Sequence, residues 1–98
     1  MLQETRADRP TSPERRARAR AANLADVAAY HLMELRKAQH LTQSDVGARM
    51  GVTQRRISAI EHGDIETFQL DTVRAYVEAL GGTVKVVADF GDRQITVA

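Results

Sequence analysis

The sequence contains no cysteine, and none of its apolar runs is long. Without cysteine, the 98-residue chain can form neither a disulfide bond nor a thiolate metal site. No apolar run approaches the length of a signal-peptide core or a membrane-spanning helix, so we expect a cytoplasmic protein that does not contact a membrane. A chain this short is near the lower limit for a self-sufficient core, which favours one small domain stabilised as a homodimer.

The sequence also lacks the groups of residues that form an active site. It has no glycine loop to cradle phosphate, no nucleophile beside a base, and no acidic cluster at useful spacing. Ser58 and the histidines form no visible triad, and His40 and His62 have no cysteine companions for a metal. We therefore predict a binding protein with no catalytic residue, no metal site and no cofactor.

Residues 42–63 carry the most informative pattern, which begins with a short helix. Thr42 can cap this helix, and Val46 and Met50, one turn apart, would form its buried stripe. Gly47 would lie on the inner side, where a side chain would hold two crossing helices apart. The first half of the pattern therefore predicts a helix that packs closely against a neighbour.

The second half of the pattern predicts a tight turn and another helix. Gly51 supplies the positive φ that ends the first helix, and Val52 fills the corner. Thr53 can cap the second helix, in which Ile57 and Ile60 are buried by i, i+3 spacing. The outer and N-terminal faces of this helix are left with Gln54, Arg55, Arg56, Ser58 and Ala59.

These exposed residues suit a helix that reads DNA. The N-terminal residues of a recognition helix enter the major groove, where glutamine can bond adenine and arginine can bond guanine. Gln43, at the start of the preceding helix, is placed to bond a phosphate through its amide or its backbone N–H. The alternative is an ordinary αα-hairpin with a solvated polar face, but many positions match the DNA-binding pattern in register.

The motif resembles the helix-turn-helix of the phage-repressor and Cro superfamily, often called the XRE family. The resemblance is carried by Leu-Thr-Gln at 41–43, Gly-Val-Thr-Gln at 51–54 and Ile-Glu-His-Gly at 60–63. It implies a mainly α fold, a lambda-repressor-like bundle of four to five helices. We assign residues 23–82 to this DNA-binding domain.

Longer segments are similar to the HigA-type antitoxins of toxin–antitoxin pairs. Residues 34–43 and 70–82 carry this similarity, which covers roughly residues 24–98. It implies a protein that neutralises a small RNA-cleaving toxin of RelE/HigB type and represses its own operon. The alternatives are a stand-alone XRE-family repressor without a toxin and a protein-interaction module without DNA binding.

The resemblance also assigns roles to individual residues of a homodimer on a near-palindromic, double-stranded DNA operator. We expect Gln54 and Arg55 to read bases, Arg56 and Ser58 to contact bases or phosphates, and Gln43, Thr53 and His62 to hold phosphate. His62 replaces an asparagine common in the family, and Ala59 is short where longer side chains often read a base, though its methyl could meet a thymine methyl. An Arg36–Glu61 ion pair is implied as well, with a direct Arg36–phosphate contact as the alternative.

Charge is distributed unevenly along the chain, although the net charge is only +1. Residues 1–22 hold six arginines and three acids, residues 23–63 hold five bases and four acids, and residues 64–98 hold three bases and six acids. A basic N-terminal part and an acidic C-terminal part suit a protein that faces phosphate at one end and a cationic partner, such as a small basic toxin, at the other. The alternative for residues 64–98 is that their charges are scattered over the surface and simply solvated. The weak overall charge predicts modest non-specific DNA affinity.

The front of the chain is predicted to be a basic arm, residues 1–22, that is partly disordered and partly helical. Residues 1–11 have no periodicity, whereas Ser12-Pro13-Glu14 is a helix start. The arginine-rich residues that follow either extend into the next helix or order only on a partner, which could be DNA phosphate or a toxin.

The next helix, residues 24–38, is predicted to bury an apolar stripe against the motif. Its members are Leu24, Val27, Ala28, His31, Leu32 and Leu35, with His31 at the boundary of the stripe.

The rear of the chain is predicted to form a fourth core helix and a hairpin. Phe68 should pack inward, and Leu70, Val73, Val77 and Leu80 give an apolar stripe that ends at Gly81-Gly82. Residues 83–98 then predict a two-stranded β hairpin, with strands at 83–89 and 94–97 around a turn at 90–93. Because an isolated hairpin is marginally stable, we expect it to exchange strands across a two-fold dimer, with a toxin-binding edge or a simple lid as alternatives.

Overall fold

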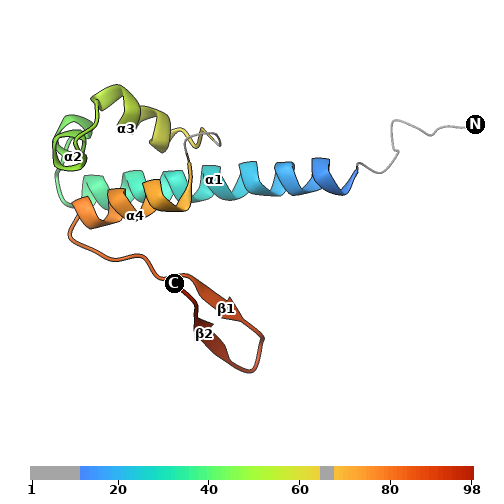
Figure 1. The fold of residues 1–98 in the computed structure, drawn as a ribbon. Helices are drawn as coiled ribbons and strands as arrows, with labels where there is room; N and C mark the ends of the chain where they lie inside the picture. The colour runs from blue at the N-terminus through green and yellow to red at the C-terminus, as the bar shows by residue number, and fades with distance from the viewer. Residues whose placement is uncertain (1–11, 65–67) are drawn as a thin grey trace, which may run out of the picture.

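The structure, a computed structural model, describes residues 12–64 and 68–98. In these residues four α-helices precede a two-stranded antiparallel sheet (Figure 1). The elements are α1 (Pro13–Ala38), α2 (Gln43–Met50), α3 (Gln54–Glu61), α4 (Leu70–Ala79), β1 (Val87–Asp89) and β2 (Gln94–Thr96). The predicted mainly α fold with a C-terminal hairpin is confirmed. The disorder expected for residues 1–11 lies outside the described residues.

Helix α1 begins at the predicted start, Ser12-Pro13, and extends well beyond the predicted packed segment 24–38. The Ser12 hydroxyl accepts a hydrogen bond from the Arg15 backbone N–H at 3.1 Å, and Pro13 is the first helical residue. The helix then continues without a break through the arginine-rich segment, which is therefore a lead-in to the core part of α1. The boundary expected between residues 22 and 23 falls inside this helix, whose N-terminal half extends beyond the other helices (Figure 1).

The predicted buried face of α1 is wrong. The buried residues are Ala25, Ala29, Leu32 and Arg36, at i, i+4, i+7 and i+11, so only Leu32 belongs to the expected stripe. The large side chains of that stripe face outward instead: Leu24 is 71% exposed, Val27 57% and Leu35 50%. His31 is also exposed, with its Nδ1 3.4 Å from the Glu34 carboxylate.

The reason for this difference is the close approach of the segment that follows α3, since a Cβ at Gly63 would lie only 3.3 Å from the Ala25 carbonyl oxygen. Apolar periodicity selects the largest side chains, but α1 presents alanines on its buried side, where small residues let another helix backbone come near. The outward leucines and valine therefore form an uncovered apolar face on α1.

Helices α2 and α3 form the predicted helix-turn-helix, and their caps explain where each begins. Thr42 and Asp45 cap α2 reciprocally: Asp45 N–H donates to the Thr42 hydroxyl at 3.0 Å, and Thr42 N–H donates to the Asp45 carboxylate at 2.8 Å. At Gly47 a Cβ would lie 2.8 Å from the Val52 carbonyl oxygen, so only glycine fits this crossing. Gly51 ends α2 with a φ of 75°.

The core lies where α2, α3 and α4 meet the C-terminal half of α1. Its buried members are Leu32, Val46, Ile57, Ile60, Tyr76 and Leu80, and Phe68 packs against them as predicted. Helix α4 departs from the expected stripe at two positions. Leu70, at its first turn, is 47% exposed, whereas Tyr76 is completely buried. Tyr76 is three residues after Val73 and so shares the stripe, and its hydroxyl finds a buried partner that the apolar pattern did not reveal.

The hairpin is shorter than predicted and extends away from the helices (Figure 1). The first strand begins at Val87 rather than at Thr83, and Val87, Ala88 and Asp89 pair with Thr96, Ile95 and Gln94. Alternation places Val86, Ala88, Phe90, Ile95 and Val97 on one face, opposite a more polar face that includes Val87, Asp89, Gln94 and Thr96. Phe90 is 64% exposed and Val97 61%, so the hairpin has an uncovered apolar face of its own.

Candidate nucleic-acid interface

The N-terminal half of α3 presents three exposed polar side chains in succession. Thr53 caps the helix by accepting a hydrogen bond from the Arg56 N–H at 3.1 Å, so its hydroxyl has a structural role in the free protein. Gln54, Arg55 and Arg56 follow and are exposed, while Ile57 and Ile60 are buried beneath them. The inner face of α3 is thus apolar and buried and its outer face polar and exposed, as a groove-reading helix requires.

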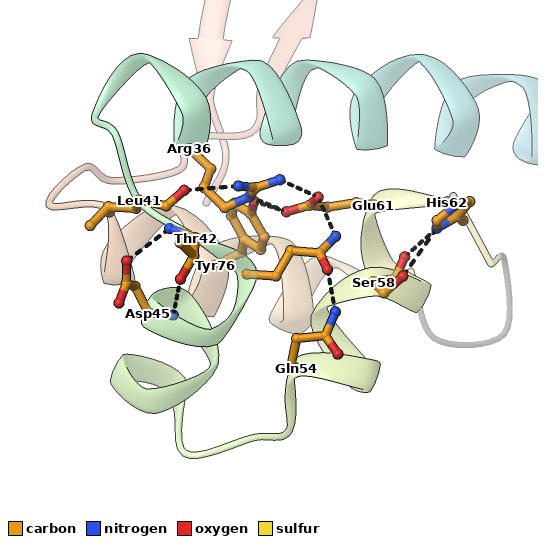
Figure 2. A network of polar contacts seen from close by, with 10 residues as sticks. Arg36, Leu41, Thr42, Asp45, Gln54, Ser58, Glu61, His62 and Tyr76 are labelled. Atoms are coloured by element: carbon orange, nitrogen blue, oxygen red, sulfur yellow. Dashed lines mark hydrogen bonds and ion pairs between the residues drawn. The ribbon is translucent and has the colours of Figure 1, made fainter.

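The other expected contact residues lie nearer the C-terminal end of α3. Ser58 and Ala59 are partly buried, and His62 is the exposed C-cap residue (Figure 2). The His62 ring nitrogen Nδ1 lies 2.6 Å from the Ser58 carbonyl oxygen and 3.5 Å from its hydroxyl. His62 and Ser58 therefore form a local pair toward the C-terminal end of α3, and Ser58 lies one helical turn after Gln54.

Arg36 and Glu61 form a buried ion pair between α1 and the end of α3 (Figure 2). The guanidinium donates from Nε to Glu61 Oε2 at 2.7 Å and from Nη2 to Oε1 at 2.9 Å, a bidentate arrangement. Its Nη1 donates to the Leu41 carbonyl oxygen at 2.8 Å, which fixes the link between α1 and α2. Arg36 therefore has the ion pair that the family resemblance implies.

Glu61 also accepts hydrogen bonds from two groups that the sequence did not place beside it. The Tyr76 hydroxyl donates to Oε2 at 2.5 Å, and the Gln43 amide nitrogen donates to Oε1 at 3.0 Å. The carbonyl oxygen of the Gln43 side chain accepts in turn from the amide nitrogen of Gln54. A chain of hydrogen bonds thus connects the buried core with the first residue of α3.

These contacts determine the protonation of the network. Burial by itself would raise the pKa of Glu61, but the hydrogen bonds from Arg36, Gln43 and Tyr76 outweigh it and lower that pKa below its usual 4.5. Hydrogen bonding to Glu61 raises the pKa of Arg36, and burial followed by the bond to Glu61 raises the pKa of Tyr76. At neutral pH, Glu61 and Arg36 are charged and Tyr76 keeps its proton.

The lowered pKa of Glu61 makes folding stability depend on pH. A carboxyl group with a lowered pKa in the folded state stabilises the fold above its unfolded pKa, and this stabilisation is lost as pH falls through the folded pKa. We expect the free energy of unfolding to decrease as pH falls below about 5. Tyr76→Phe removes one donor, so the decrease should be shallower, whereas exposed Tyr30→Phe should leave it unchanged. Urea unfolding at a series of pH values measures the free energy of unfolding of the wild type and of both variants. If this free energy falls equally with pH in all three proteins, the role of Glu61 is refuted.

Two further properties concern the described ranges as a whole. No helix within 12–64 and 68–98 is long and apolar enough to cross a bilayer. In the same ranges, no three His, Asp or Glu side chains are grouped closely enough to hold a metal ion.

The fold and this site define a helix-turn-helix protein, and comparison with known proteins agrees. The model of the HTH_3 helix-turn-helix family matches residues 32–86. HigA2 of Mycobacterium tuberculosis (strain ATCC 25618 / H37Rv), assigned as an antitoxin, is 42% identical over 97 residues, which cover 99% of this chain and 96% of the relative. HigA3 of the same organism, also assigned as an antitoxin, is 49% identical over 70 residues, or 70% of this chain and 64% of the relative.

Two solved structures share the fold at 46% sequence identity. One is described as DNA-bound antitoxin HigA3, with a TM-score of 0.61, and the match covers 67% of this chain and 86% of the other. The second is described as showing DNA bending induced by a unique dimerization of HigA antitoxin, with a TM-score of 0.59 and coverage of 67% and 88%. The chain belongs to the HigA-type antitoxins of the XRE helix-turn-helix family.

Proposed function

We propose that this chain is a sequence-specific DNA-binding antitoxin, which neutralises a small basic toxin of RelE/HigB type and represses its own operon. The DNA-binding part rests on one observation: Gln54, Arg55 and Arg56 are exposed in succession on α3, a helix that is capped at its start and buried on its inner face. The DNA-bound state described for the structural neighbour HigA3 supports the same part. The role is one of binding, without catalysis or cofactor, in the cytoplasm where the operator lies.

The hairpin is proposed as the element that joins two copies. Its apolar face includes Phe90, Ile95 and Val97, all exposed in the single chain, and each short strand has a free edge. Pairing with a second copy would cover the apolar face and the free strand edges. A two-fold dimer presents two α3 helices about 34 Å apart, one DNA turn, and therefore suits a near-palindromic operator. The dimerization described for one structural neighbour is consistent with this proposal.

The surface proposed for the toxin combines apolar and acidic features. The uncovered face of α1, with Leu24, Val27 and Leu35, offers apolar area to a protein partner. Residues 64–98 carry six acids and three bases, which complement a basic protein.

Arg55→Ala should separate base reading from general attraction to DNA. An arginine that bonds guanine in bidentate fashion contributes roughly 1–3 kcal/mol of discrimination at one base pair. We expect the variant to lose that much binding free energy on the operator and to show a relaxed base preference at a single position. Its affinity for random duplex should change little. Fluorescence anisotropy at fixed salt measures both, and Lys37→Ala at the exposed end of α1 is the control. An equal loss on operator and random DNA would refute Arg55 as a base reader.

The antitoxin part is tested by purifying the tagged full-length chain from its native cells and identifying what accompanies it by mass spectrometry. The expected result is a near-stoichiometric small basic protein, encoded next to this chain, that cleaves RNA alone and not in the complex. Recovery of only DNA and a second copy of this chain would contradict the antitoxin role and leave a stand-alone repressor.

A further inference from the structure

The ring of His62, the C-cap residue of α3, is held in one direction by the end of its own helix (Figure 2). Its Nδ1 lies 2.6 Å from the Ser58 carbonyl oxygen, which belongs to the last turn of α3. A carbonyl oxygen only accepts hydrogen bonds, so Nδ1 must carry a hydrogen and donate it. In the neutral ring the second nitrogen, Nε2, then has no hydrogen and is an acceptor. The hydrogen bond therefore fixes the tautomer of neutral His62.

This ring lies on the face of α3 that is proposed to meet DNA. His62 follows Arg55 by seven residues, about two helical turns, so both share one face of the helix, and both are exposed. Arg55 is near the start of α3, whereas His62 is at its end. The last turn of a helix carries the partial negative charge of its unpaired carbonyls, so a phosphate at this end is repelled unless a cation lies beside it.

The carboxylates around His62 add to this negative charge. Asp64 follows two residues later and is exposed. Asp26 of α1 reaches the same turn, since its Oδ1 lies 2.6 Å from the place that a Cβ on Gly63 would take. The carboxylate of Glu61 is buried in its ion pair in the core. A protonated His62 can therefore supply, at the end of α3, the positive charge that arginines supply at its start.

We propose that His62 binds a DNA phosphate as an imidazolium, so that each copy of the chain takes up one proton from the solvent when it binds DNA. The proposal rests on the proposed DNA-binding function and states the protonation of one contact. With Nδ1–H held by Ser58, the neutral ring would turn the Nε2 lone pair toward a phosphate oxygen, and two acceptors share no hydrogen bond. A proton on Nε2 replaces this repulsion with a charge-assisted hydrogen bond.

Proton uptake is a consequence of having histidine at this position. Asparagine, the residue common there in the XRE family, donates an amide N–H at every pH, so it binds phosphate without gaining a proton. Histidine changes its charge between about pH 5 and pH 8. DNA binds the charged ring in preference, so affinity should be highest at the acidic end of this range and fall as the pH rises.

His62→Asn tests the proposal by fluorescence anisotropy at fixed salt, with a duplex that the wild-type chain selects from a random library. The wild-type affinity should fall by about tenfold or more for each bound copy between about pH 6 and pH 8.5, because a hydrogen bond to a charged group is lost. This range lies above the pH at which Glu61 ceases to stabilise the fold. In His62→Asn the affinity should be nearly constant over the same range.

The other two histidines of the chain provide the matched controls. His31 and His40 are both exposed, and His40 has a φ of 59°, which asparagine accepts readily. His31→Asn and His40→Asn should therefore keep the pH dependence of the wild type. An equal pH dependence in His62→Asn and the wild type would overturn the proposal.

NMR of the ring nitrogens of His62 provides a readout that does not depend on affinity. In the free chain at high pH the hydrogen should be on Nδ1, and at about pH 7.5 DNA should increase the fraction of rings with both nitrogens protonated. A hydrogen on Nε2 in the free chain, or a ring that stays neutral in the DNA complex, would overturn the proposal while the DNA-binding function stands. If the wild type selects no sequence at all, the proposed DNA-binding function fails, and this assignment fails with it.

Discussion

Arg36→Met is expected to destabilise the fold by about 3–5 kcal/mol, because removing one partner leaves the other charge buried. Arg36 is 7% exposed, and Glu61 would keep only the donors from Tyr76 and Gln43. The substitution also removes the hydrogen bond from Arg36 to the Leu41 carbonyl oxygen, which holds the loop between α1 and α2 in place. Urea unfolding followed by circular dichroism measures the loss.

The matched control for this prediction is the next residue along the helix. Lys37 is exposed at the end of α1, so Lys37→Met should change stability by no more than about 0.5 kcal/mol. If Arg36→Met costs no more than Lys37→Met, the ion pair is not needed for the fold. Retained stability would also contradict a buried and ionised Glu61.

Ile95→Asp is expected to separate the proposed dimer and to weaken operator binding by about 10²–10⁴-fold, the advantage that two linked binding modules have over one. Ile95 lies on the apolar face of the hairpin and is 41% exposed in the single chain. A carboxylate there would be buried without a partner when two hairpins meet, which is costly. Sedimentation equilibrium reports the dimer, and fluorescence anisotropy with a duplex selected from a random library reports the binding.

The neighbouring residue provides the control for the dimer. Thr96→Asp adds the same charge on the same strand but on the polar face, so both dimerisation and operator affinity should be kept. A dimeric Ile95→Asp protein with full affinity would show that the two copies meet elsewhere. The uncovered face of α1 would then be the next surface to alter.

Local signals were enough to predict the helix-turn-helix. Thr42, Gly47, Gly51 and Thr53 each have a role that depends on a few neighbouring residues: a cap, a close crossing or a positive φ. Such roles follow from backbone geometry and side-chain size, which the sequence states directly. The start of α1 at Ser12 and Pro13 was predictable for the same reason.

The parts that the sequence did not reveal depend on contacts between distant segments. Periodicity shows that α1 has an apolar stripe, but not that its neighbours pack on the alanine side and leave Leu24 and Leu35 outside. Tyr76 is fifteen residues from Glu61, and no spacing rule places its hydroxyl on that carboxylate. Gln43 was expected to hold phosphate because it lies at the start of the helix before the recognition helix, and no spacing rule predicts its hydrogen bonds to Glu61 and Gln54.

Selection of bound duplexes from a random library by the full-length chain, followed by sequencing, tests the central claim most directly. The claim is that two copies read DNA through the N-terminal residues of α3. The expected result is an inverted repeat whose half-sites lie about one helical turn apart, with a preference that is lost in the Gln54→Ala/Arg55→Ala double variant. No enriched sequence, or the same enriched sequence from the double variant, would contradict the account.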